Sequence, residues 1–187
     1  MPNWCYNNAD ITAKTPEQMQ LLQRIAERNK EKQGVFNIIR PLPAELENTV
    51  KGTGEYQQEI FIDGCNNWFD WQVNHWGTKW DIDPVSEEFD GETLSLSFDS
   101  AWSPPIELYK YLVEQGFDVS ANYYEPGMNF AGEWVNGDDF MIEDVYALAR
   151  QDAETLSVQE YDILAMFGIW EEVAQYDEDE EDLVDEP

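Results

Sequence analysis

The stretch Thr93-Leu94-Ser95-Leu96-Ser97-Phe98-Asp99 decides the fold of this chain. Leu94, Leu96 and Phe98 alternate with polar residues, which is the period-two pattern of a strand with one buried face. A strand of this kind needs a second layer to cover that face. The stretch therefore predicts a sheet that is packed on one side.

Two amphipathic helices supply the predicted covering layer. The first begins with a capping signal, Thr15 followed by Pro16 and Gln18, and we expect it to end at Gly34. The second begins at Ser103-Pro104 and ends at Gly116. Their apolar stripes are Met19, Leu22, Ile25, Ala26, Leu108, Tyr109, Leu112 and Val113.

Further strands are predicted around these helices, with an Asn136-Gly137 hairpin turn between the last two. The order strand, helix, strand, strand, helix, strand predicts an α+β chain. We expect a ferredoxin-like (split βαβ) antiparallel sheet with helices on one face and extra hairpin strands. The additional strands are expected at 4–13, Val35 to Ile39, 117–124, 129–135 and 138–143.

The chain is expected to have three parts. Residues 1–143 form the ferredoxin-like domain, 144–176 a C-terminal helical extension and 177–187 a disordered acidic tail. Within the extension, Asp144 to Arg150 and Ser157 to Tyr176 are predicted helices.

Charge is distributed unevenly along the sequence. Six of the 40 acidic residues and seven of the ten basic ones lie before residue 52. The rest of the chain holds 34 acids against Lys79, Lys110 and Arg150, a net charge of −31 over 136 residues. Solubility needs a net charge of only about 2 to 8 in magnitude, so this excess indicates a function.

An anionic field of this size repels nucleic acid and anionic membranes. We therefore expect no direct binding to either, and a partner that is a basic, nucleic-acid-binding protein. The polar start Met1-Pro2-Asn3-Trp4 is not typical of a signal peptide, and no apolar run approaches 18 residues. We expect a cytoplasmic protein.

Cysteine and histidine are scarce. Cys5 and Cys65 are expected to be free and buried, and His75, beside tryptophans, to pack in the core. Two cysteines and one histidine do not make a structural zinc site. We expect no cofactor, no metal and no catalytic residues.

Four separated segments resemble the YubB-type ferredoxin-like family of plasmid and phage proteins. The resemblance covers roughly residues 1–140 and implies a ferredoxin-like fold and an origin in a mobile element. It implies no activity, and it does not include the acid-rich end. The segments are Met1-Pro2-Asn3-Trp4-Cys5, Asn74-His75-Trp76-Gly77-Thr78-Lys79-Trp80-Asp81, Ser100-Ala101-Trp102-Ser103-Pro104-Pro105, and Tyr124-Glu125-Pro126-Gly127 with Phe130-Ala131-Gly132.

These observations favour a non-enzymatic inhibitor that mimics DNA. Carboxylates held in an array can engage the Arg and Lys residues of a host restriction or CRISPR effector in place of phosphates. The partner-binding residues that we predict are Asp138, Asp139, Glu143, Asp144, Glu154, Glu160, Asp162, Glu171, Glu172, Asp177, Glu178, Asp179 and Glu180.

Two alternatives belong to other classes. An adaptor would dock a partner groove through the apolar stripe of the last helix, Ile163, Phe167, Trp170 and Val173. A metal-dependent hydrolase would use paired carboxylates, such as Asp81 with Asp83.

Overall fold

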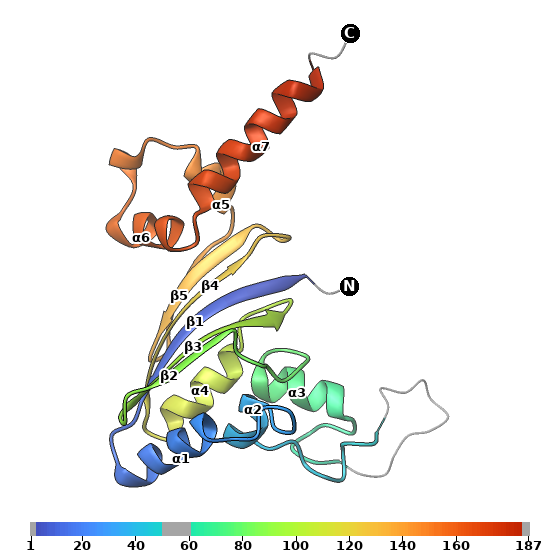
Figure 1. Cartoon of the computed structure of the whole chain (residues 1–187). Helices are drawn as coiled ribbons and strands as arrows, with labels where there is room; N and C mark the ends of the chain where they lie inside the picture. Colours follow the sequence, from blue (N-terminus) through green and yellow to red (C-terminus); the bar gives the residue numbers. More distant parts are fainter. Residues whose placement is uncertain (1–2, 50–60, 185–187) are drawn as a thin grey trace.

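The computed structural model describes residues 3–49 and 61–184, with side chains as far as Glu178. A six-stranded antiparallel sheet runs through it in the order β2-β3-β1-β4-β5-β6 (Figure 1). Its strands are β1 (Trp4–Thr12), β2 (Ser86–Phe89), β3 (Thr93–Ala101), β4 (Asp118–Glu125), β5 (Phe130–Val135) and β6 (Asp138–Ile142).

Four helices cover one face of this sheet (Figure 1). They are α1 (Pro16–Ala26), α2 (Val35–Ile39), α3 (Trp68–Trp76) and α4 (Ile106–Glu114). Leu94, Leu96 and Phe98 of β3 point into the core beneath them and are at most 4% exposed. The predicted mixed α+β fold with an antiparallel sheet is confirmed.

The start of α1 follows its sequence signal, and its end does not. Thr15 accepts a hydrogen bond from the Gln18 backbone N–H, and the Gln18 side chain accepts one from the Thr15 N–H. The helix stops at Ala26, well before Gly34. Beyond its end, Arg28 folds back and donates from Nη1 to the Ile25 carbonyl at 2.8 Å.

The predicted strand at Val35 to Ile39 is wrong, because the structure has helix α2 there. A short apolar run does not distinguish strand from helix by itself. The Asp81 carboxylate caps this helix, accepting from the Phe36 N–H at 2.7 Å and the Asn37 N–H at 2.9 Å. Gly34 makes the contact possible, since a Cβ there would overlap the Asp81 side chain.

The strand that takes the place of the one predicted at Val35 to Ile39 is β2, at the edge of the sheet beside β3. It is short and polar, as edge strands often are, and for this reason the sequence pattern did not predict it. Glu87 points inward and forms an ion pair with Arg28 at 2.7 Å, with 5% and 1% of their side chains exposed. This pair attaches the edge of the sheet to the end of α1.

The meander of β4, β5 and β6 forms as predicted. Asn136 and Gly137 adopt φ values of 50° and 112°, which suits a two-residue hairpin turn. The Asn136 side chain also accepts a hydrogen bond from the Val119 N–H of β4 at 2.8 Å. The turn is therefore attached to the sheet that it extends.

The C-terminal extension is a separate layer of helices: α5 (Val145–Ala149), the 3-10 helix η1 (Ala153–Thr155), α6 (Val158–Met166) and α7 (Ile169–Val184). Where we expected one helix over 157–176, the chain breaks between α6 and α7 at Gly168, whose φ is 64°. Where we expected disorder from Asp177, α7 continues to Val184. It projects away from the sheet (Figure 1).

A second core joins this extension to the sheet face opposite α1–α4. Tyr124 and Ala131 face it from β4 and β5, and their neighbours Tyr123 and Gly132 face the other way. The helices contribute Val145, Ile163, Leu164, Ile169 and Val173. The sheet thus has helices on both sides, with only the β4–β6 end covered on the second side.

Candidate functional site

The three cations that follow residue 52 are all engaged by a neighbour. Lys110 pairs with Glu107 at 2.8 Å and Arg150 with Asp177 at 2.5 Å. Lys79 lies 4.5 Å from the centroid of the Trp80 ring. These contacts neutralise two of the many acids in this part of the chain, so its field remains strongly negative.

The sheet face opposite α1–α4, beyond the second core, carries exposed acids beside the exposed side chains of Trp4, Tyr6 and Val135, and we call it the open sheet face. One of its rows runs across four strands through Glu88, Ser95, Asp10 and Ser120. Ser95 donates a hydrogen bond to the Asp10 carboxylate at 2.6 Å. Glu88 and Asp10 are two strands apart, which corresponds to about 10 Å.

Other exposed acids lie on the same face. They are Asp99 on β3, Asp118 on β4 and Asp138 on β6. Lys14 pairs with Asp118 at 2.6 Å, with about half of each side chain exposed. Such a pair is weak in water and leaves the face anionic. The open sheet face was not among the residues predicted from sequence, apart from Asp138.

The predicted pair Asp138 and Asp139 does not share a face. Both are exposed, but successive residues of a strand point to opposite sides, so Asp138 belongs to the open sheet face and Asp139 to the other. Asp139 accepts a hydrogen bond from the Tyr123 hydroxyl at 2.6 Å. The expectation of one joint patch on this hairpin is therefore corrected.

Two other predicted acids are helix caps. Asp144 accepts from the Ala147 N–H at 2.9 Å and from the Asn129 side chain at 2.8 Å. Glu160 accepts from the Ser157 N–H at 2.8 Å, and its hydrogen bonds with Ser157 lower the pKa of the Glu160 carboxyl. Both carboxylates are held by local structure. Glu143, Glu154 and Asp162 are exposed.

Glu171 and Glu172 are neighbours in α7 with different environments. Glu171 is exposed. Glu172 turns toward the sheet and accepts from the hydroxyls of Tyr124 and Tyr146, each at 2.7 Å. Burial, together with this carboxylate, raises the pKa values of both phenols, that of Tyr146 to about 12. Glu172 holds α7 against β4, and is not presented to a partner.

The apolar stripe of the adaptor alternative lies inside the second core. Ile163 and Val173 are at most 4% exposed. The Phe167 ring packs 5.7 Å from Tyr124, and Trp170 packs 4.8 Å from Tyr161, between ring centroids. The four side chains bind the extension to its own sheet, which removes the free docking stripe.

Helix α7 concentrates the remaining acids. Its 16 residues include eight acids and no lysine or arginine. At 1.5 Å per residue the helix is about 24 Å long, and its six acids other than Glu172 and Asp177, which are bonded within the chain, average about one negative charge per 4 Å. One strand of DNA has one phosphate per about 3.4 Å. Asp177 pairs with Arg150 and Glu178 is exposed; Asp179 and Glu180 lie in the helix, with side chains outside the described set.

The candidate nucleophiles are core residues. Cys5 and Cys65 are free and buried, as predicted. Burial, reinforced by the nearby Glu125 carboxylate, raises the pKa of the Cys5 thiol, so this sulfur is held as the unreactive thiol. His75 is 8% exposed, and its ring stacks on Trp71 with centroids 4.4 Å apart.

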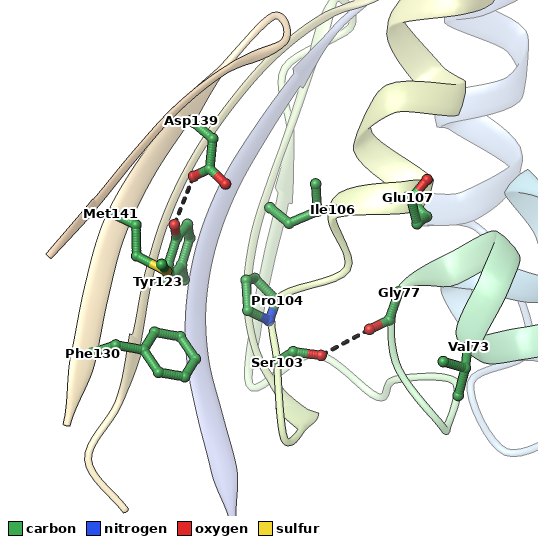
Figure 2. Close-up of a pocket in the computed structure, with 10 residues that line it drawn as sticks. All are labelled: Val73, Gly77, Ser103, Pro104, Ile106, Glu107, Tyr123, Phe130, Asp139 and Met141. Carbon is green, nitrogen blue, oxygen red and sulfur yellow. Dashed lines mark hydrogen bonds between the residues drawn. The ribbon is translucent and has the colours of Figure 1, made fainter. Parts of the chain in front are cut away.

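Sequence reasoning missed a groove between the sheet and the helices (Figure 2). Its volume is about 380 Å³. It lies on the side of the sheet that α3 and α4 partly cover, and Asp139 is at its margin (Figure 2). The signal in the sequence was Gly132, since a glycine inside a strand often marks a close approach of another group.

Across residues 3–49 and 61–184, no cluster of three or more His, Cys, Asp or Glu residues could hold a metal ion. In the same part of the chain, none of the helices is both long and apolar enough to cross a membrane. A comparison with protein-family models, curated proteins and solved structures found no match to this chain.

Proposed function

We propose that this protein is a non-enzymatic inhibitor that occupies the nucleic-acid site of a basic host defence protein by imitating DNA. The observation that carries the proposal is α7, a projecting helix with eight acids, no bases and a charge spacing close to that of one DNA strand. A cationic cleft built for phosphates would attract such a helix by the same field.

The open sheet face supports the same function. Its acids are spaced across a rigid sheet, so binding would order few side chains. Asp10 is already oriented by Ser95, at 2.6 Å. Together with α7 this face gives a basic partner two anionic surfaces of one folded chain.

The ferredoxin-like plan and the mobile-element origin belong to the same proposal. The strand order β2-β3-β1-β4, with helices between β1 and β2 and between β3 and β4, supports the proposed split βαβ plan. A plasmid or phage gains from blocking host proteins that cut its DNA, and the family resemblance fits that origin.

The test uses purified restriction and CRISPR effector complexes, each bound to labelled duplex DNA. The full chain should displace DNA from at least one of them. A variant that neutralises part of α7 should displace it at least tenfold less well. Its substitutions are Asp177→Asn, Glu178→Gln, Asp179→Asn and Glu180→Gln.

A matched variant removes four acids from the balanced first segment and should inhibit as the natural chain does. Its substitutions are Glu17→Gln, Glu31→Gln, Glu45→Gln and Glu47→Gln, all at exposed positions. Equal loss in both variants would mean that net charge alone acts. Failure of the natural chain to displace DNA from any complex would refute the proposal for this class of partner.

A further inference from the structure

The floor of the groove comes from three strands. Tyr123, Phe130 and Met141 line it from β4, β5 and β6 (Figure 2). Gly132 is the register partner of Tyr123, and a Cβ at this position would overlap the phenol. Glycine thus lets the phenol lie across β5 and reach Asp139 on β6, at 2.6 Å.

The opposite wall is fixed by the junction of α3 and α4. Pro104 and Ile106 face the floor (Figure 2). Ser103 donates a hydrogen bond to the Gly77 carbonyl at 2.8 Å. Gly77 has a φ of 88°, and a Cβ there would lie only 3.1 Å from the backbone nitrogen of Glu107, so the two helices approach closely. Both sides of the groove are therefore preformed.

The groove is apolar inside and anionic at its margin. Within the described part of the chain, Asp139 accepts from Tyr123 and takes part in no ion pair. Glu107, on the other side, pairs with Lys110 at 2.8 Å, with both side chains about half exposed. A pair of that exposure exchanges easily for another cation.

This combination selects a particular kind of ligand. A carboxylate beside aromatic and aliphatic walls suits a cation that carries an apolar stem and a flat face. A volume of about 380 Å³ accepts one side chain. We infer that the groove between β4–β6 and the α3–α4 junction binds the guanidinium side chain of an arginine from the basic partner.

This inference rests on the proposed function and makes it more specific. In it, α7 supplies long-range attraction and the groove receives one arginine that would otherwise contact a phosphate. Arginine is favoured over lysine because its guanidinium stacks on aromatic rings and bonds a carboxylate in a fixed geometry, whereas an ammonium is a strongly hydrated point charge.

The test is an NMR titration of the ¹⁵N-labelled full chain with N-acetyl-arginine methylamide at millimolar concentration. Amides of Phe130, Met141 and Tyr123 should shift. The citrulline analogue, which has nearly the same shape without the charge, should shift them far less. Asp139→Asn should weaken arginine binding about tenfold, because it removes the charge and keeps an acceptor for Tyr123.

Asp138→Asn is the matched control, since the neighbouring acid lies on the opposite face of the same strand. It should leave arginine binding unchanged. Met141→Trp, at a half-exposed position, should fill the groove and abolish binding even if Asp139→Asn perturbs the hairpin. Equal binding of citrulline, or equal loss in Asp138→Asn and Asp139→Asn, would overturn the inference.

The two proposals fail separately. If the chain displaces DNA from an effector but arginine leaves the groove resonances unchanged, the groove assignment is wrong and the mimicry stands. If arginine binds the groove but no effector loses its DNA, the groove remains an arginine site and the proposed function is wrong.

Discussion

Replacing Glu172 with alanine should loosen the C-terminal extension from the sheet. The Glu172 carboxylate accepts hydrogen bonds from Tyr124 and Tyr146, both at 2.7 Å. Tyr124 is 2% exposed, so its hydroxyl cannot turn to water. It can keep only a longer bond of 3.2 Å to the Tyr146 hydroxyl.

The expected cost follows from these contacts. A hydrogen bond to a charged group contributes roughly 1.5 to 3 kcal/mol, and a buried donor left unsatisfied costs a similar amount. Tyr146 is only partly buried, so its hydroxyl can bond water instead, and the lost hydrogen bond from Tyr124 accounts for most of the cost. We expect the free energy of opening of the extension to fall by about 2 kcal/mol relative to Glu171→Ala. That control removes the same charge from the adjacent, exposed position of α7.

Hydrogen exchange measured by mass spectrometry on peptides from α6 and α7 reports this opening directly. About 2 kcal/mol corresponds to roughly a thirtyfold loss of protection. If Glu172→Ala and Glu171→Ala differed by less than about 0.5 kcal/mol, the carboxylate would not hold the extension.

Three further predictions concern the ion pair, alkaline pH and salt. Arg28→Ala should lower the free energy of unfolding in urea by about 3 kcal/mol, because it leaves the buried Glu87 carboxylate with only the exposed Lys30, at 3.2 Å, as a cationic partner. The exposed Arg24→Ala should cost less than about 0.5 kcal/mol, and equal costs would argue against the Arg28–Glu87 pair. The pKa of Tyr146 is raised to about 12, above its ordinary value near 10. The extension should therefore be fully stable below about pH 10 and lose stability as the pH rises toward 12, which circular dichroism can follow. A flat profile over this range would contradict the contact between Tyr146 and Glu172. Between 10 and 500 mM NaCl, the Cα chemical shifts of residues 177–182 should become more helical, because salt screens the repulsion between the acidic side chains of α7. Shifts that do not depend on salt would show that this repulsion does not affect the helix.

Elements that depend on near neighbours were predictable from the sequence. The alternation in β3, the capping box of α1 and the Asn136-Gly137 turn are all encoded within a few residues. Helix α2 was not predictable in this way, since its cap is Asp81, 45 residues later in the chain. The edge strand β2 was missed because its inward Glu87 becomes buried only through Arg28.

In the candidate site, too, local features were predictable from the sequence and tertiary contacts were not. Exposure of Glu171 or Asp162 could be expected from composition, and the Ser157-x-x-Glu160 capping box was readable as a helix start. The attachment of Glu172 to two tyrosines required the tertiary position of α7. The groove required the register of β4, β5 and β6, which a single sequence does not specify.

The salt dependence of partner binding tests the central claim most directly. The dissociation constant between the full chain and an effector from which it displaces DNA would be measured from 50 to 500 mM NaCl. Recognition by an array of carboxylates predicts that binding weakens at least tenfold over this range. A dissociation constant that stays the same would show that the acids do not carry the recognition, and would contradict the imitation of DNA.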